Sequence, residues 1–297
     1  MNTTPPVCDY EGSDYQQSFW EKGNRAYEDA AEEIAIRRLL PPGSGRLLEL
    51  GAGAGRNTHR YKGYSQITLL DYSTTQLAQA IERLGNGKKY RYIAADVYRL
   101  PFAPGVFDAA TMIRTLHHLS EPAKAFAQIN ETLSDGAHFL LEFANKRNIK
   151  SIMRYWLKKQ DWSPFTEEQV EFVKLNFDFH PRRVKAQLAE NHFSVEKQIA
   201  VSYLRANFFK RILPLPVMKF LERILQRGFS WAALSPSIFL STTANSGQPQ
   251  AEEGVFFRCP ACRHHPLADT PPLLTCTRCG ATFPVKDNIY DFRMLEG

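Results

Sequence analysis

Two pairs of cysteines near the C-terminus have the spacing of a metal site. Cys259 and Cys262 form one CxxC pair, Cys276 and Cys279 form a second, and thirteen residues separate the pairs. The two thiolates of a CxxC turn face the same side, so that two such turns close a tetrahedral site of four sulfur ligands. We therefore expect these cysteines to hold a structural Zn²⁺ ion, with iron as the less favoured alternative.

A glycine-rich turn follows a short apolar run earlier in the chain. The run Leu47–Leu50 passes directly into Gly51-Ala52-Gly53-Ala54-Gly55. Glycines at such a turn let the backbone reverse sharply and approach a bound ligand closely. A nicotinamide-binding GxGxxG loop would place its third glycine where Arg56 stands. Glu49, just before the turn, suits a positively charged ligand better than a pyrophosphate.

Carboxylates follow the next two apolar runs. Asp71 ends the second run, twenty residues after Gly51, where a carboxylate accepts hydrogen bonds from both hydroxyls of a ribose. Asp96 follows the third run, in a position suited to an adenine amino group. Open α/β sheets bind ligands at the carboxyl ends of their strands. The three acidic residues therefore predict one ligand site at that edge.

The elements that position these residues alternate between apolar runs and amphipathic stretches, which predicts a doubly wound α/β sheet. We expect seven strands in a Rossmann-like sheet, interrupted by helical insertions. The expected strands are residues 47–50, 67–70, 92–94, 107–113, 139–143, 193–201 and 237–243. The expected helical segments are residues 27–40, 74–84, 121–133, 149–175, 181–191 and 208–229.

This pattern divides the chain into four parts. Residues 1–40 are expected to form an N-terminal helical lid, and residues 41–243 the sheet domain, with a substrate cap at about 146–235. Residues 244–253 are polar and without apolar periodicity, so they read as a linker. Residues 254–297 are expected to form a small zinc ribbon, whose folding depends on its metal because so short a module has little core.

The motifs LLELGAGAG, LLDYS, AADVYRLPF and FDAATMIRTLHHL resemble those of class I S-adenosylmethionine-dependent methyltransferases, in particular the broad type 11 group. The resemblance covers residues 25–145 and, more weakly, the last two strands. It implies that S-adenosylmethionine is the cofactor. Its methionine part would lie against Glu49 and the turn, its ribose against Asp71 and its adenine against Asp96. The implied cofactor-binding residues are Glu49, Gly51, Ala52, Gly53, Gly55, Asp71, Tyr72, Asp96, Val97, Ile113 and Arg114.

The C-terminal module has its own resemblance. Its text from FRCPACRHHPL to LLTCTRCGATFPVKDNIYDF is similar to the zinc ribbon of the small activator subunit that partners several tRNA, rRNA and release-factor methyltransferases. Phe283 and Asn288 replace a tyrosine and a glycine of that pattern. By analogy, the fused module would stabilise the catalytic domain or help to present substrate.

Methyl transfer mainly requires alignment of the acceptor with the methyl group, so the reaction need not involve a general base. His117 and His118, just beyond the fourth strand, are the candidate catalytic residues, since a neutral imidazole accepts a proton near pH 7. A structural role for both is the alternative. His180, in the cluster Phe177–His180, is a candidate substrate contact. Tyr15, Trp20, Arg25 and Tyr27 are candidates for a lid or, equally, for helix anchors.

Charge and composition limit the protein classes and locate the basic residues of the chain. The chain has 297 residues and a net charge of +6 with ordinary hydrophobic content, which argues against disorder, collagen and a disulfide-rich secreted module. Residues 146–227 contain 17 Lys and Arg against 8 Asp and Glu. That segment therefore has a net charge of +9. Since the whole chain has a net charge of +6, the remaining residues have a net charge of −3. Basic groups interleaved with aromatic residues suit RNA, an anionic lipid surface or a solvated helix face.

Three functions are consistent with these observations. The favoured one is methyl transfer to a small-molecule or lipid-like acceptor. The alternatives are methylation of tRNA, rRNA or a translation factor, and a non-catalytic scaffold that binds the cofactor. The chain start lacks a secretory signal and no apolar run reaches the 18 to 20 or so residues of a membrane span. With four of five cysteines in one cluster, a cytoplasmic protein is expected. Peripheral membrane contact stays open.

Overall fold

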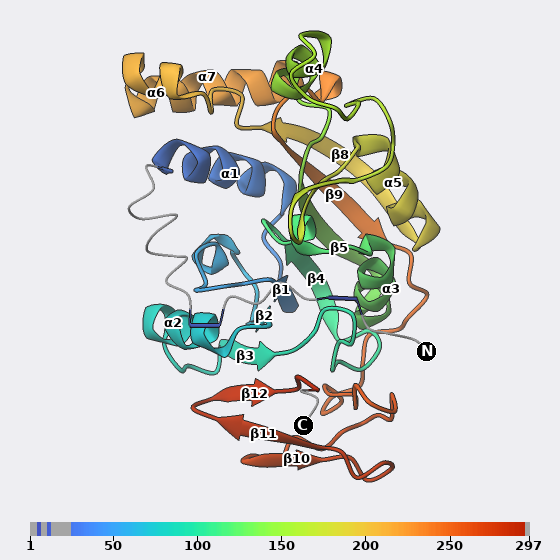
Figure 1. Ribbon diagram of the computed structural model, residues 1–297. Coiled ribbons are helices and arrows are strands. Elements are labelled where there is room, and N and C mark those ends of the chain that lie inside the picture. Colours follow the sequence, from blue (N-terminus) through green and yellow to red (C-terminus); the bar gives the residue numbers. More distant parts are fainter. Residues whose placement is uncertain (1–4, 7–10, 13–24, 295–297) are drawn as a thin grey trace.

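A ten-stranded sheet runs through the protein, whose computed structural model describes residues 5–6, 11–12 and 25–294. Its strand order is β10-β11-β12-β3-β2-β1-β4-β5-β9-β8 (Figure 1). The strands are β1 (Arg46–Leu50), β2 (Gln66–Asp71), β3 (Tyr90–Ala94), β4 (Phe107–Met112), β5 (Leu133–Ala144), β8 (Phe193–Val201), β9 (Ser237–Ala244), β10 (Leu273–Thr275), β11 (Thr282–Lys286) and β12 (Ile289–Asp291). The predicted α/β class with a mostly parallel central sheet is confirmed.

Seven of these strands lie where the sequence predicts them. β1 pairs in parallel with β2 and β4, and β3 and β5 extend the parallel sheet on either side. β9 pairs antiparallel with both β5 and β8, so the seventh predicted strand lies between the fifth and the sixth predicted strands. The sheet is larger than predicted because the C-terminal strands join it rather than form a separate layer.

Helices cover both faces of the sheet, which explains the nearly continuous apolar character of its strands. Leu47 and Leu48 are adjacent in β1 and both fully buried, yet they belong to opposite cores. One core packs beneath α1, α2 and α7, and the other beneath α3 and α5. The helices are α1 (Ala26–Leu39), α2 (Thr74–Leu84), α3 (Pro122–Thr132), α4 (Ile149–Trp156), α5 (Pro181–Glu190), α6 (Asn207–Ile212) and α7 (Leu215–Gly228).

The segment expected to be helical over 149–175 is helical only in part. α4 ends at Trp156, and a hairpin follows, made of β6 (Val170–Val173) and β7 (Asn176–Asp178). The sequence Val-Glu-Phe-Val of β6 favours a strand because three of its four side chains are β-branched or aromatic. Leu175 then turns the chain with a φ of 55°. Helical periodicity was therefore the wrong prediction for residues 157–175.

Residues 244–253, predicted to be a linker, are hydrogen-bonded to the sheet domain. The backbone amide of Ala251 donates to the carbonyl of Gly105 at 2.9 Å, and the amide of Asp135 donates to the carbonyl of Gln248 at 2.8 Å. A Cβ atom on Gly105 would lie 2.0 Å from the carbonyl oxygen of Pro249, so a glycine is needed where the two backbones meet. The polar composition of this segment reflects surface exposure instead.

The C-terminal module is joined to the sheet through its last strand. β12 pairs in parallel with β3, with Tyr290 opposite Ile93. Phe257 is fully buried against Phe102 and Phe292, with ring centroids 6.5 and 5.0 Å away. The buried Arg258 pairs with Glu131 of α3 at 2.6 Å. The module therefore shares its core with the sheet domain, which gives it more apolar support than its length alone predicts.

Candidate functional site

The glycine turn after β1 runs close to the chain that leaves β4. Gly51 and Gly53 have φ values of 64° and 52°, a region that favours glycine. A Cβ atom on Gly51 would lie 2.0 Å from Oγ1 of Thr115, so any side chain there would displace this neighbour. Gly55 has a φ of 69°, and a Cβ atom there would meet Leu84 of α2 at 2.8 Å. Gly55 thus serves helix packing, whereas Gly51 and Gly53 shape the turn.

Asp71 at the end of β2 is oriented by two backbone amides. The amide of Gly53 donates to Oδ2 at 2.8 Å, and the amide of Ser73 donates to Oδ1 at 3.0 Å. Each carboxylate oxygen can accept more than one hydrogen bond. The carboxylate is therefore held in a fixed orientation with further acceptor capacity, and it links β2 directly to the glycine turn.

Glu49 lies deeper, at the end of β1. Its carboxylate is 5 % exposed and accepts hydrogen bonds from the Thr58 hydroxyl at 2.6 Å and the Tyr61 hydroxyl at 3.0 Å. Burial raises the pKa of Glu49 to about 7, although both hydrogen bonds and the charges of Arg56 and Arg60 oppose this rise. Near neutral pH this carboxyl group therefore exists in both charge states, so that a nearby cation would favour its ionised form.

These residues surround a hollow of about 1050 Å³, counting the open space at its mouth. Among the predicted cofactor residues, its wall includes Glu49, Gly51, Ala52, Gly53, Asp71, Tyr72, Val97, Ile113 and Arg114, and it also includes His118. Additional wall residues are Leu50, Ala54, Arg56, Asn57, Leu70, Gln76, Ala95, Thr115 and Leu119. The structure thus brings together residues from the ends of β1, β2 and β4, as the parallel topology requires.

Three predicted site residues do not line this hollow. Gly55 packs against α2, as described above. The Asp96 carboxylate accepts a hydrogen bond from the amide of Tyr98 at 2.9 Å, and burial raises its pKa. His117 is half-buried and stacks against His118, with ring centroids 3.9 Å apart. Val97, which follows Asp96, and His118, which follows His117, do line the hollow.

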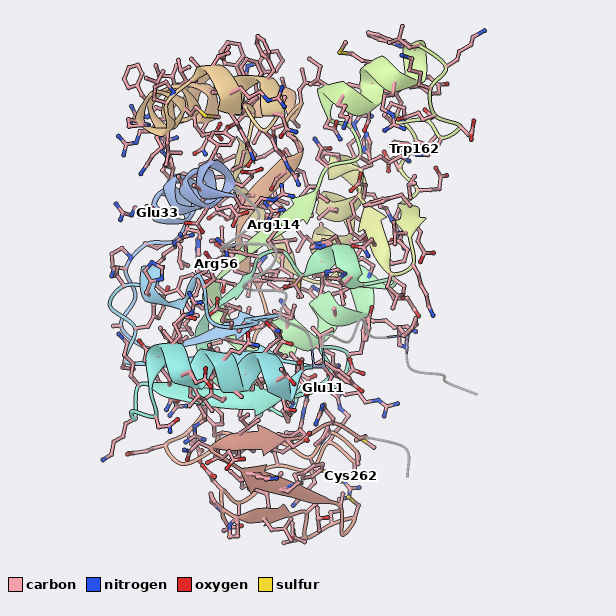
Figure 2. All side chains as sticks on the ribbon, turned by 60° about the vertical axis from the view of Figure 1, so that its left-hand side comes forward. Glu11, Glu33, Arg56, Arg114, Trp162 and Cys262 are labelled. Carbon is pink, nitrogen blue, oxygen red and sulfur yellow. The ribbon has the colours of Figure 1, made fainter. Side chains whose placement is uncertain are left out.

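An ion-pair network closes the hollow on the side of α1, and the sequence analysis did not predict it. The fully buried Glu32 of α1 lies 2.6 Å from Arg56, in the turn, and 2.6 Å from Arg114, after β4. Burial opposes its ionisation, but the charges of Arg114 and Arg56 hold the pKa of Glu32 at about 2. Figure 2 shows both arginines beside α1. The one available signal was an acidic residue within the buried face of an amphipathic helix.

The pKa of His118 lies below its ordinary value, which favours the neutral imidazole. Burial lowers its pKa, while a hydrogen bond to the Leu175 carbonyl partly opposes the shift. Its Nδ1 lies 3.0 Å from that carbonyl oxygen. A carbonyl only accepts, so Nδ1 carries the proton and Nε2 is the basic nitrogen. The pKa of His117 lies well below its usual range because of burial and the charges of His118, Arg114 and Arg205.

A second group of polar side chains lies beyond the hollow, where β7 packs against η3 (Leu116–His118). Burial raises the pKa of Asp178 to about 6, with the charge of Arg205 opposing and that of Glu142 adding to the rise. Arg205 in turn lies 3.8 Å from the buried Glu28. Arg114 connects this group to the hollow, since its amide donates to Glu142 at 2.8 Å.

Other candidates from the sequence have structural roles. Nδ1 of His180 accepts from the amide of Arg182 at 3.3 Å, so His180 caps the start of α5. The Tyr27 hydroxyl donates to Glu222 of α7 at 2.5 Å, and Arg25 pairs with Glu28 at 3.1 Å. Tyr27 is therefore a helix anchor rather than part of the hollow. Tyr15 and Trp20 lie outside the described residues.

The four C-terminal cysteines gather at one point. Their sulfur atoms all lie within 4.8 Å of one another. The Sγ atoms of Cys259 and Cys279 are 3.7 Å apart, and those of Cys262 and Cys276 are 3.6 Å apart. Four sulfurs around Zn²⁺ at about 2.3 Å would be separated by about 3.8 Å in a tetrahedron. The sulfur positions therefore fit a Zn²⁺ ion held by four thiolates.

Comparison with known proteins identifies the sheet domain. Residues 48–141 match the family described as a methyltransferase domain. This match and the fold support a class I S-adenosylmethionine-dependent methyltransferase domain in this part of the chain. This methyltransferase domain includes the glycine turn, Asp71 and both histidines.

Relatives of this methyltransferase domain have different activities. The chain is 26 % identical to an O-methyltransferase of Penicillium expansum, over 47 % of this chain and 54 % of that protein. It is 24 % identical to malonyl-[acyl-carrier protein] O-methyltransferase of Legionella pneumophila, over half of each. It is 27 % identical to demethylmenaquinone methyltransferase of Clavibacter sepedonicus, over 38 % of this chain and 47 % of that protein. The chain thus spans about half the length of these relatives.

Solved structures share the fold of the methyltransferase domain. A chain from the complex of the Trm112 methyltransferase activator with a methyltransferase of Haloferax volcanii superposes with a TM-score of 0.55 and 14 % identity, over 77 % of this chain and 96 % of that chain. An S-adenosylmethionine-dependent methyltransferase of Mesorhizobium loti gives a TM-score of 0.50 and 19 % identity, over 73 % of this chain and 99 % of that chain. At these identities the likeness concerns the fold alone.

Proposed function

We propose that this protein transfers a methyl group from S-adenosylmethionine to a small-molecule or lipid-like acceptor. The observation that carries this proposal is the hollow at the carboxyl ends of β1, β2 and β4, where Asp71 is fixed by the amide of the glycine turn at Gly53. An adenosine-containing ligand needs an oriented pair of acceptors for its ribose hydroxyls, and Asp71 supplies them. Two relatives are named for acceptors of quite different chemistry, malonyl-[acyl-carrier protein] and demethylmenaquinone, so we infer that residues outside this shared site select the acceptor.

The residues around the hollow fit this cofactor. When bound, S-adenosylmethionine supplies a methyl group already activated by a sulfonium. Gly51 and Gly53 would border its methionine part, Asp71 with Tyr72 its ribose, and Val97 the region of its adenine. Glu49 would ionise in response to the positive charge of the ligand, because its pKa of about 7 leaves it easily deprotonated.

The methyl acceptor would be bound and deprotonated by polar side chains at and beyond the hollow. Nε2 of His118 is the proton acceptor that we assign, since this residue lies in the wall of the hollow and its lowered pKa favours the neutral imidazole. Arg205 and Asp178 would orient the acceptor beside it, because they lie beyond the hollow on the loop after β8 and on β7. Such a group suits an acceptor that carries an acidic hydroxyl or carboxyl group.

We also propose that the C-terminal module is a zinc ribbon with a structural ion bound by Cys259, Cys262, Cys276 and Cys279. Four thiolates close the coordination sphere, so no position remains for a catalytic water. His264 and His265 are not needed as ligands. The ribbon would stabilise the methyltransferase domain through the β12–β3 pairing.

Two measurements test this function. Calorimetry of the zinc-loaded protein with S-adenosylmethionine should detect binding to one site, and its absence would reject the shared premise of any methyltransferase function. Incubation of fractionated lysate with labelled S-adenosylmethionine should place the label in the small-molecule or lipid extract. Label in RNA or protein would instead support the alternative acceptors, and cofactor binding without any transfer would support a scaffold.

A further inference from the structure

Helix α7 packs Leu221 and Leu225 against the core, yet it also turns large apolar side chains toward solvent. Its buried residues are Met218, Glu222 and Gln226, spaced four apart on the side that faces α1. The fully buried Glu222 accepts from the Tyr27 hydroxyl at 2.5 Å and from the Ser202 amide at 2.8 Å. A surface helix of a globular protein normally buries its apolar side. The exposed apolar side chains on the other side of α7 therefore require another explanation than packing within this chain.

The exposed side of α7 is strongly apolar. Phe220 is 60 % exposed and Ile224 is 49 % exposed, and both lie between the buried residues of the helix. Phe208 on α6 is 65 % exposed, and Trp231 on η4 (Ser230–Ala232) is 82 % exposed. Side chains of this size rarely stand so far into water when they are adjacent.

This apolar surface continues onto α4. The amide of Ile149 donates to the carbonyl of Leu234, just after η4, at 2.9 Å, so α4 begins beside η4. Trp156 on α4 is 71 % exposed. Figure 1 shows α6, α7 and α4 at the end of the molecule opposite β10–β12. We call this surface the aromatic face; it consists of Trp156, Phe208, Phe220, Ile224, Phe229 and Trp231.

The charge around the aromatic face has one sign. Residues 205–231 contain six Lys and Arg and a single acidic residue, Glu222, which is fully buried. A groove of about 1190 Å³ between α1 and α7 adds to this charge. Its basic residues are Arg37, Arg38, Lys219, Arg223 and Arg227, and its one acidic residue is Glu33, which pairs with Arg37 at 2.5 Å. Burial and the charges of Arg227 and Arg223 lower the pKa of Arg38.

The composition of the surface favours lipid over RNA. Aromatic rings stack on bases, and cations contact phosphates, so both ligands explain the aromatic and basic residues. Exposed aliphatic side chains cannot stack, yet Ile212, Leu215, Val217 and Ile224 are each more than a third exposed on the same two helices. These residues gain free energy only by leaving water for an apolar medium.

We propose that the aromatic face and the α1–α7 groove dock this protein on the surface of an anionic lipid bilayer. The aromatic and aliphatic side chains enter between the headgroups, while the arginines and lysine of the groove contact lipid phosphates. Docking of this kind needs no membrane-spanning helix. In the part of the chain that the structure describes, no helix is both long and apolar enough to cross a bilayer.

Vesicle sedimentation of the full-length, zinc-loaded protein tests this proposal without any dependence on catalysis. Vesicles of phosphatidylcholine mixed with phosphatidylglycerol should bind the protein at least about tenfold more tightly than vesicles of phosphatidylcholine alone, and added salt should weaken this binding. No binding to either vesicle, or equal binding to both, would overturn the proposal. Because the cofactor hollow is tested separately by calorimetry, its failure and the failure of docking are distinguishable.

Matched variants assign the surface. R223E/R227E should lose the preference for anionic vesicles, whereas K88E/K89E, an exposed pair on another surface, should keep it. F220S/I224S should reduce binding about tenfold, whereas L273S, an exposed apolar residue on β10, should not. Thermal unfolding and S-adenosylmethionine binding should be unchanged in every variant. If bulk tRNA competes with vesicles and the same variants lose tRNA binding with no loss of vesicle binding, the surface recognises RNA and the proposal is wrong.

Discussion

Glu32 of α1, which is fully buried, pairs at 2.6 Å with Arg114, the residue two positions after β4. The same carboxylate pairs with Arg56 of the glycine turn at 2.6 Å. One acidic residue thus fastens α1 to two segments that border the cofactor hollow. The geometry of the hollow therefore depends on the position of α1, although α1 supplies none of the residues in its wall.

Replacement of Glu32 by glutamine should destabilise the protein by about 3 kcal/mol, because it removes a fully buried carboxylate that two partly buried arginines share as a counter-charge. Chemical denaturation measures the loss. E33Q on the same helix is the control, since the Glu33–Arg37 pair involves a largely exposed arginine and should contribute about 1 kcal/mol or less. Equal stability of E32Q and wild type would contradict this assignment.

The same carboxylate predicts a stability change in acid. Its pKa falls from 4.5 to about 2 on folding, so the folded state favours the ionised form. The stabilisation is present above about pH 4.5 and is lost as the pH falls through the interval down to about 2. Its size is about 3 kcal/mol. Denaturation curves between pH 2 and 6 should show this loss in wild type and a smaller one in E32Q.

Glu49 should make cofactor affinity depend on pH. Burial raises its pKa to about 7, so ionisation as the pH rises from 6 to 8 should strengthen binding of the positively charged S-adenosylmethionine several-fold. Calorimetry across this range measures the change, and E49Q should show weaker binding with a flatter pH profile. S-adenosylhomocysteine, which lacks the sulfonium charge, should show a smaller dependence. An unchanged slope in E49Q would exclude Glu49 as the titrating group.

His118 and His117 should differ in their effects on turnover. H118Q should lower kcat by about 10²-fold without changing cofactor affinity, because it removes the proton acceptor at the wall of the hollow. H117Q should have a smaller effect, since His117 does not line the hollow. Single-turnover kinetics with the acceptor found in the labelling experiment distinguish the two. A larger loss in H117Q would reverse the assignment.

Removal of zinc should weaken both folding and cofactor binding. The C-terminal module contacts the site directly, because Arg293 donates to the carbonyl of Tyr72 at 3.3 Å and the amide of Phe292 donates to the carbonyl of Ala94 at 2.8 Å. C262S should lose the metal, lower Tm and expose the β3 amides to hydrogen exchange. C8S, which alters the cysteine outside the cluster, should behave as wild type. Full stability of a metal-free protein would contradict a structural role.

The sequence alone determined the features that depend on short spacings. The two CxxC pairs predicted a four-sulfur cluster because each turn places its thiolates locally. The residues from Leu47 to Gly55 predicted a strand and a tight turn. A short apolar run and the glycines after it fix the local backbone through a few neighbouring residues. The alternation of apolar runs and amphipathic stretches predicted seven strands in a doubly wound sheet, because each element has its own short hydrophobic period. The spatial order of these strands comes from the structure.

Only the tertiary structure decided which distant residues meet. Glu32 reads as an ordinary helix carboxylate until α1 packs beside Arg56 and Arg114. The ribbon reads as a separate module until β12 pairs with β3, a contact that no local pattern encodes. α7 reads as an amphipathic helix of either orientation, because periodicity shows that two sides differ but not which one is buried. Burial of Glu222 and exposure of Phe220 follow from the partners that the fold provides, Tyr27 and the chain after β8.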